Sequence, residues 1–156
     1  MPFWNTLPGK WIITVGIAMT PLLELRGAIP LGVAAGLTPW EAFAASVIGN
    51  LIPVPFILLL IRQVFRWLKK GAWWGPKIRK LERRAHLKGR LVRKYRLPGL
   101  VLLVAIPLPG TGAWTGALVA ALLDIRMRQA LPAIALGVVL AGLITTAVTC
   151  GVMTLF

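Results

Sequence analysis

The sequence predicts an all-α integral membrane protein made of two inverted repeats, each a re-entrant helical hairpin followed by a full transmembrane helix. Two observations lead to this prediction: a mean hydropathy of +0.80 and uncharged stretches at residues 42–61, 97–123 and 129–156. Each stretch reaches the length of about 20 residues that a helix needs to cross the hydrocarbon core. A third observation, the gathering of positive charge in one segment between the two apolar halves, orients the chain.

The basic segment, residues 62–96, contains 14 of the 18 Lys and Arg residues and one acid, Glu82. Positive charge between membrane-length apolar stretches is typical of a cytoplasmic loop, and we expect it to bind anionic lipid headgroups. A basic interfacial helix from about Pro76 to Lys94 and a solvated loop both fit its spacing. No nucleic-acid partner is expected, because about 35 residues without an apolar core are too few for a soluble binding domain.

The first apolar stretch is interrupted by Glu24 and Arg26, with Pro21 before them and Pro30 after them. Two interpretations fit this pattern. Residues 10–36 form one span with both charges at its centre, or they form a re-entrant hairpin whose turn carries both charges. In the hairpin, arms of about 10–13 residues, rising about 1.5 Å per residue, reach only halfway through the bilayer.

A full span is predicted next, and Asn50, Pro53 and Pro55 lie in its middle. Proline lacks the N–H that a helix needs and clashes with the preceding turn, so we expect a kink or local unwinding there. Asn50 is expected to hydrogen-bond the facing hairpin, in a structural or a substrate-binding role.

The second half repeats this plan. PLPGTG at residues 107–112 holds two prolines and two glycines, which forbid a regular helix. PLLELRGA at 21–28 aligns with PLPGTGA at 107–113 after deletion of one residue, and broken helices at corresponding positions of two repeats point to a transporter-like site. The predicted parts are a first membrane repeat at 1–61 (hairpin 8–38, span 40–61), the basic cytoplasmic segment at 62–96 and a second membrane repeat at 97–156 (hairpin 97–123, span 128–155).

The basic segment sets the predicted orientation. With it in the cytoplasm, the second hairpin enters from the cytoplasm and returns there, so Arg126 and Arg128 also lie inside, as the positive-inside rule favours. A four-span arrangement would place both arginines outside. We therefore expect a multi-pass protein of the cytoplasmic (inner) membrane with both termini on the outer side. A homodimer is also expected, because two spans and two hairpins make a thin bundle.

Glu24 and Arg26 are the candidate substrate- and proton-binding residues. A charged side chain at the bilayer centre costs at least about 2.5–3.5 kcal/mol, so such residues face protein or a water-filled cavity and pair with other groups. One interpretation is structural: the two charges neutralise each other and hold the turn. In the other, Arg26 holds an anionic group such as phosphate by bidentate hydrogen bonds, and Glu24 exchanges a proton.

The second turn supplies complementary groups. Gly110 and Gly112 allow the backbone to approach a ligand closely, and Thr111 adds a hydroxyl. Short helices that begin after each turn would aim unpaired N–H groups toward the midplane and favour an anion there. Trp114 fits either stacking on a substrate or ordinary packing. The residues assigned to the hairpin turns themselves are Pro21, Pro30, Pro107 and Pro109.

No pattern typical of a catalytic or metal site is present. The sequence lacks GxSxG and HExxH, and the one carboxylate clearly within the apolar zone is Glu24. Cys150 is the single cysteine and His86 the single histidine, so an intrachain disulfide and a Cys-based metal set are both ruled out. We therefore expect no enzyme activity, no metal and no cofactor.

Three motifs resemble the small multi-drug export protein family of bacteria and archaea: PLLELRGAIPLG at 21–32, GN at 49–50 and AIPLPGTGAWTGALVA at 105–120. That family is distantly similar to the DedA family of membrane proteins, which also carry a Glu and an Arg in proposed re-entrant hairpins. The resemblance implies a transport role, and DedA relatives are linked to flipping of undecaprenyl phosphate. The second turn departs from the DedA pattern, because it has Thr111 and no arginine.

Two functions are therefore compatible with the sequence. In the first, the chain is a transporter or translocase for a small amphiphilic substrate, a lipid phosphate such as undecaprenyl phosphate or a drug-like molecule, with proton coupling through Glu24. In the second, it is a non-transporting membrane scaffold whose basic segment binds anionic lipid or a partner protein. A polar, water-filled cavity reaching Glu24 and Arg26 would favour the first, and a dry ion pair the second.

Overall fold

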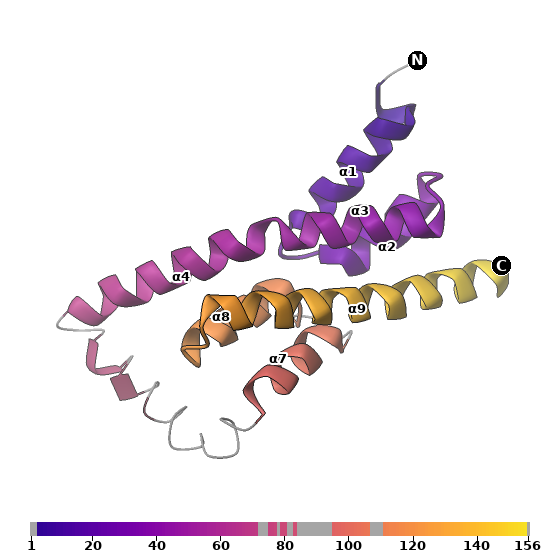
Figure 1. Cartoon of the computed structure of the whole chain (residues 1–156). Coiled ribbons are helices and arrows are strands. Elements are labelled where there is room, and N and C mark those ends of the chain that lie inside the picture. Colours follow the sequence, from indigo (N-terminus) through magenta and orange to yellow (C-terminus); the bar gives the residue numbers. More distant parts are fainter. Residues whose placement is uncertain are drawn as a thin grey trace.

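Every regular element in the described part of the chain is helical, as predicted (Figure 1). The computed structural model describes residues 3–71, 75–77, 79–80, 83, 95–106 and 111–155. Two helical stretches among these residues, Pro39–Val64 and Met127–Leu155, are long and apolar enough to cross a membrane, by length and composition. The helices are η1 (Phe3–Asn5), α1 (Leu7–Met19), α2 (Glu24–Ala34), α3 (Pro39–Leu51), α4 (Pro53–Lys70), α7 (Arg96–Ala105), α8 (Ala113–Leu122) and α9 (Met127–Leu155).

The turn between α1 and α2 lies earlier than predicted. Helix α1 ends at Met19, and Pro21 lies in the turn that follows it. Glu24 and Arg26 belong to the first turn of α2 and not to the connecting turn. The prediction that the turn carries both charges is therefore wrong, because the turn is complete by Leu23.

Pro30 is also not a turn residue, since it lies inside α2. A proline at this position removes one helical hydrogen bond. The helix nevertheless continues to Ala34, and the neighbouring Ala28, Ile29 and Gly32 are buried. Tertiary packing of this face outweighs the missing bond.

Helices α3 and α4 together form the first long apolar helix. Thr38 begins it with a capping box, in which its hydroxyl accepts from the Glu41 N–H and the Glu41 carboxylate accepts from the Thr38 N–H. The break between α3 and α4 falls at Ile52, immediately before Pro53, as the prolines predict. Ile52 keeps right-handed helical backbone angles, φ −55° and ψ −50°, so α4 continues in the general direction of α3 (Figure 1).

The second half begins with the short helices α7 and α8. Helix α7 ends at Ala105, and α8 begins at Ala113 after Gly112. The assignments of Pro107, Pro109 and Gly110 lie outside the described residues, and so does most of the interfacial helix expected in the basic segment. Helix α9 then runs without interruption for 29 residues, although it contains Pro132.

In each half, a glycine allows a short helix to pack closely against the long helix. In the first half, a Cβ at Gly49 of α3 would come within 2.5 Å of the Val15 carbonyl of α1. In the second, a Cβ at Gly137 of α9 would come within 2.6 Å of the Val104 Cβ of α7. Each glycine therefore allows the two helix backbones to approach closely.

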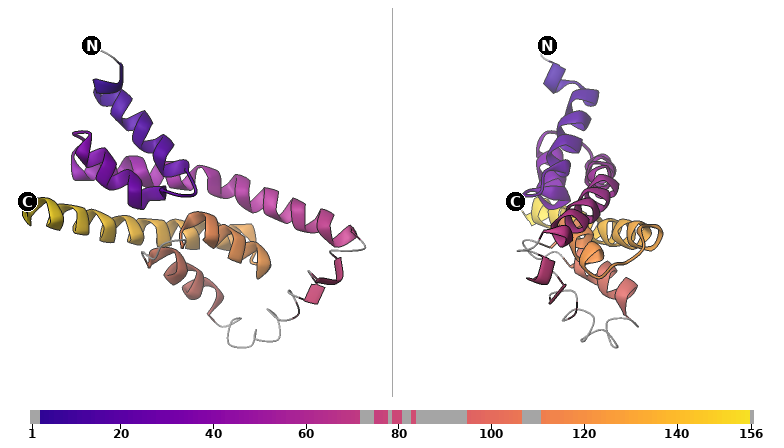
Figure 2. Two further views of the ribbon diagram at one scale, coloured as in Figure 1. Left: turned by 180° about the vertical axis from the view of Figure 1, so that it is seen from behind. Right: turned by 90° about the vertical axis from the view of Figure 1, so that its left-hand side faces the viewer.

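The two halves meet along the long helices. Helix α3 packs against α9, and α4 packs against α8, as Figure 1 and the left view of Figure 2 show. Helix α2 also packs against α9, and its Leu25 and Ile29 join the buried core. This contact brings the first turn of α2 to the short helices of the second half.

Candidate functional site

Glu24 places its carboxylate at the N-terminus of α8. Its side chain is buried, with 8 % of its surface exposed, and its carboxylate accepts a hydrogen bond from the backbone N–H of Trp114, the second residue of α8. A Cβ at Gly112 would overlap the same carboxylate. The first N–H groups of a helix lack partners within the helix and favour negative charge. Glu24 therefore caps a helix that belongs to the other half of the chain.

Arg26 binds the connection between α7 and α8. Its Nη2 donates hydrogen bonds to the carbonyl oxygen of Ile106, at 3.0 Å, and to Thr111 Oγ1, at 3.2 Å. The Thr111 hydroxyl itself donates to the Ile106 carbonyl at 3.0 Å. Arg26, Thr111 and Ile106 thus form a closed triangle of polar groups between the two halves.

The two charges of α2 match the dipoles of the helices that they reach. Ile106 is the C-cap of α7, where a positive charge is favoured, and Trp114 lies at the start of α8, where a negative charge is favoured. Such interactions are worth about 0.3–1 kcal/mol each at exposed sites and up to about 2 kcal/mol when partly buried. The predicted anion preference at the start of α8 is thus met by a carboxylate of the same chain.

Glu24 also has an unusual backbone conformation. Its φ is +46°, in the left-handed region that residues with a Cβ rarely adopt. This conformation costs about 1–2 kcal/mol per residue. It marks the exact start of α2, where the backbone leaves the turn and the carboxylate turns toward α8.

The structure does not give Asn50 the hydrogen bond to the facing hairpin that the sequence predicts. Asn50 is fully buried, and its Oδ1 and Nδ2 have no partner within the described residues. Ser46, one helical turn earlier on α3, is also fully buried with an unpartnered Oγ in the same part of the structure. The sequence did not mark Ser46 as a candidate residue, although its spacing of four residues from Asn50 places both on one face of the helix.

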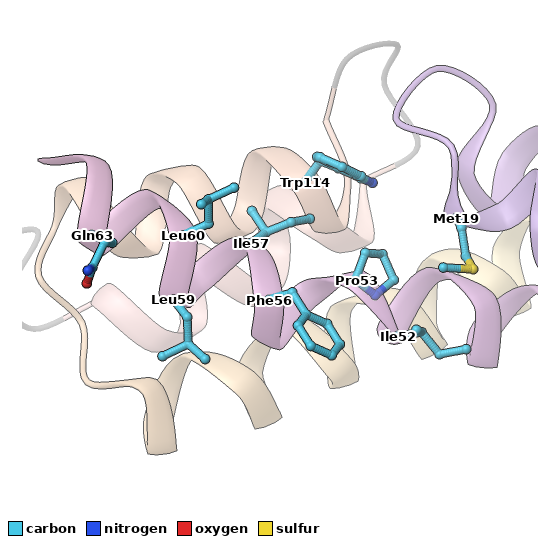
Figure 3. A pocket seen from close by; sticks show the side chains of 9 residues that line it. All are labelled: Met19, Ile52, Pro53, Phe56, Ile57, Leu59, Leu60, Gln63 and Trp114. Carbon is cyan, nitrogen blue, oxygen red and sulfur yellow. The ribbon is translucent and has the colours of Figure 1, made fainter.

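Trp114 connects the candidate site to an apolar groove. Its backbone binds Glu24, while its indole lines a groove of about 680 Å³ beside α4 (Figure 3). The indole Nε1 is buried without a partner among the described residues. The groove is lined by Met19, Ile52, Pro53, Phe56, Ile57, Leu59, Leu60, Gln63 and Trp114.

The described residues contain no group of three His, Cys, Asp or Glu side chains that could hold a metal ion. Among the described residues, the polar groups brought together are one carboxylate, one guanidinium, one hydroxyl and backbone amides at helix ends. This set can bind an anion or exchange a proton, and it is assembled from both halves of the chain.

Comparison with known proteins identifies the family. A sequence model of the family described as "Putative small multi-drug export protein" matches residues 24–144, well over half of the chain. No curated protein and no solved structure matches the chain. The matched range begins at Glu24 and contains Arg26, Thr111, Gly112 and Trp114. The chain therefore belongs to the small multi-drug export protein family.

Proposed function

We propose that the protein is a small multi-pass transporter of the cytoplasmic membrane, and that its substrate binds where Arg26 meets Thr111. The observation that carries this proposal is a pair of hydrogen bonds between the halves: Arg26 of α2 donates to Thr111 and to the Ile106 carbonyl. A guanidinium inside an apolar protein is expensive unless it is paired. Its hydrogen bonds to Ile106 and Thr111 end on neutral oxygen atoms, which an anionic ligand can replace, and the Glu24 carboxylate also offsets its charge.

The substrate class proposed is an amphiphile with an anionic group, such as a lipid phosphate. Phosphate accepts bidentate hydrogen bonds from a guanidinium, which are stronger than bonds to a neutral carbonyl or hydroxyl. The substrate phosphate would take the place of the Ile106 carbonyl on Arg26, and the Thr111 hydroxyl would donate to it. Drug-like export substrates are the second class that this site would accept.

Glu24 would couple transport to protons. The carboxylate accepts a hydrogen bond at the start of α8, and that interaction depends on its negative charge. Protonation would weaken its hold on α8 and loosen the contact between the two halves. Protonation of Glu24 would thus weaken its contact with α8. An anion bound to Arg26 would replace the hydrogen bond from Arg26 to the connection between α7 and α8.

The proposed movement is a rocking of two inverted halves, each a re-entrant hairpin followed by a long helix. In this arrangement residues 62–96 lie in the cytoplasm and both termini lie outside. The correspondence that supports it is the repeated order of two short helices and a long one, with α1 packed on α3 and α7 packed on α9.

A thermal-shift screen of the purified full chain against polyprenyl phosphates and cationic drugs tests the site. We expect a polyprenyl phosphate to raise the unfolding temperature of the wild-type protein and to have no effect on Arg26→Ala. Arg128→Gln, which removes an exposed charge at the start of α9, is the matched control and should respond like wild type. An equal shift in Arg26→Ala and wild type would contradict the assignment.

A second function, a non-transporting membrane scaffold, is favoured by one observation: Glu24 and Arg26 both bind groups of the protein itself. Water access separates the two functions. In a Cys150→Ala background, Thr111→Cys should react with a small membrane-impermeant thiol reagent if the protein is a transporter. A cysteine at 111 that stays unreactive from both sides of the membrane would favour the scaffold.

A further inference from the structure

One face of the α3–α4 helix changes from apolar to basic along its length. Ile52, Phe56 and Leu60 are spaced by four residues, and Gln63, Arg66 and Lys70 continue the same face. These six side chains are exposed, and Phe56 and Leu60 expose 69 % and 64 % of their surfaces. This face is therefore available to a ligand, with an apolar part and a cationic end.

Two hollows adjoin on this face. The apolar groove of about 680 Å³ ends at Gln63 (Figure 3), and a second hollow of about 510 Å³ begins at the same residue and is lined by Val64, Arg66, Trp67 and Lys70. Arg66 Nη2 donates a hydrogen bond to Gln63 Oε1 at 2.8 Å, which holds the guanidinium at the junction. The two hollows share Gln63, so an apolar hollow and a cationic hollow adjoin along α4.

The length of the apolar part matches one leaflet of a bilayer. Ile52 and Gln63 are separated by eleven residues, which corresponds to about 16 Å along a helix that rises about 1.5 Å per residue. Half of a hydrocarbon core of about 30 Å is about 15 Å. An acyl chain that starts at Gln63 would end beside Ile52 and Met19, near the midplane.

We propose that this site binds a single anionic phospholipid of the leaflet that faces the basic segment. Its phosphate lies between Arg66 and Lys70, and one acyl chain lies along Leu60 and Phe56 toward Met19. Trp67, 75 % exposed and located at the polar end, lies at the level of the headgroups, where tryptophan is enriched. The proposal concerns lipid binding and stands whether or not the protein transports a substrate.

The positive charges on α4 favour a lipid over a second copy of the chain as the occupant of this site. Two copies related by a twofold axis along the membrane normal would bring like ends of α4 to the same level. Arg66 and Lys70 of one copy would then face the same cations of the other, which is unfavourable. Arg62 differs from both, because its Nη2 donates to the Ile125 carbonyl and so ties α4 to the turn before α9. Arg66 and Lys70 are therefore the cations assigned to the lipid.

Native mass spectrometry of the full chain, taken from an equimolar mixture of phosphatidylglycerol and phosphatidylcholine, tests this site. We expect one retained phosphatidylglycerol per chain, and about thirtyfold weaker retention of it in the double variant Arg66→Gln/Lys70→Gln. The control Arg126→Gln/Arg128→Gln removes the same charge elsewhere and should retain the lipid. Equal retention of phosphatidylcholine, or an equal loss in the control variant, would overturn the proposal.

A second variant tests the apolar part without any change of charge. Leu60→Trp fills the groove and should reduce phosphatidylglycerol retention, whereas Val148→Trp, at a position of α9 that is 60 % exposed, should leave it unchanged. Normal lipid retention in Leu60→Trp would overturn the assignment of the acyl chain to this groove. A cross-linked dimer through Phe56→Cys in a Cys150→Ala background would also overturn it, because a second copy would then cover the site.

Discussion

The carboxylate of Glu24 lies directly against the backbone of Gly112, although 88 positions separate the two residues in the sequence. This contact brings a charge of the first half to the start of α8, where the Trp114 N–H binds it. Arg26, two residues later, binds the connection between α7 and α8 through Ile106 and Thr111. The first turn of α2 therefore contacts both short helices of the second half, at the start of α8 and at the end of α7.

The contact requires glycine at position 112. We expect Gly112→Ala to displace the carboxylate and to destabilise the protein by about 1–3 kcal/mol, the usual range for overpacking a close contact. Unfolding of the purified protein in detergent, followed by circular dichroism, measures this change. Gly16→Ala is the control, because a Cβ at Gly16 would meet nothing within 4 Å. Equal stability of Gly112→Ala and Gly16→Ala would show that the contact is absent.

Arg26 and Thr111 should be energetically coupled. A double-mutant cycle with Arg26→Met and Thr111→Val removes each partner of the hydrogen bond in turn, and we expect a coupling energy of about 0.5–3 kcal/mol in the unfolding free energy. A parallel cycle pairs Arg26→Met with Thr154→Val. Thr154 is exposed and donates to the Gly151 carbonyl of its own helix, so these two changes should be additive. Additivity in both cycles would argue against the link between Arg26 and Thr111.

Asn50 is expected to oppose stability. Its buried amide has no partner among the described residues, and a buried unsatisfied polar group costs about 1–3 kcal/mol. Asn50→Leu, which is similar in size, should therefore raise the unfolding free energy by about that amount. A loss of stability on this substitution would mean that Asn50 has a partner, such as an ordered water molecule, that stabilises the fold.

Gly137 should be more sensitive to substitution than Gly151 of the same helix. A Cβ there would lie 2.9 Å from the Val101 carbonyl and 2.6 Å from Val104 Cβ, so Gly137→Ala forces α7 away from α9. We expect a destabilisation of about 1–3 kcal/mol. Gly151→Ala serves as the reference, since a Cβ at Gly151 has open space around it. If both variants unfold alike, α7 and α9 are not packed as closely as described.

The sequence predicted the helical class of the fold and the break before Pro53, because hydropathy and proline chemistry act locally. It did not locate the first turn, since an apolar stretch shows that it is interrupted but not which residue takes a positive φ, as Glu24 does. Pro30 was assigned to a turn because a lone proline usually breaks a helix, and packing of α2 overrides this rule.

The sequence predicted which residues form the candidate site but not how these residues are arranged in space. The charge of Glu24 and Arg26 in an apolar stretch marked both residues, and the glycines marked the second turn. That Glu24 caps α8, and that Arg26 binds the carbonyl at the end of α7, depends on how α2 packs against the second half. Contacts between residues 80 or more positions apart cannot be deduced from local patterns.

Proton-driven transport in proteoliposomes tests the central claim most directly. Flux of a labelled polyprenyl phosphate is measured with and without an imposed pH gradient, for wild type, Glu24→Gln, Arg26→Ala and the control Glu41→Gln. We predict flux that responds to the gradient in wild type and Glu41→Gln, flux without that response in Glu24→Gln, and no flux above empty liposomes in Arg26→Ala. Wild-type flux in Arg26→Ala would contradict the account.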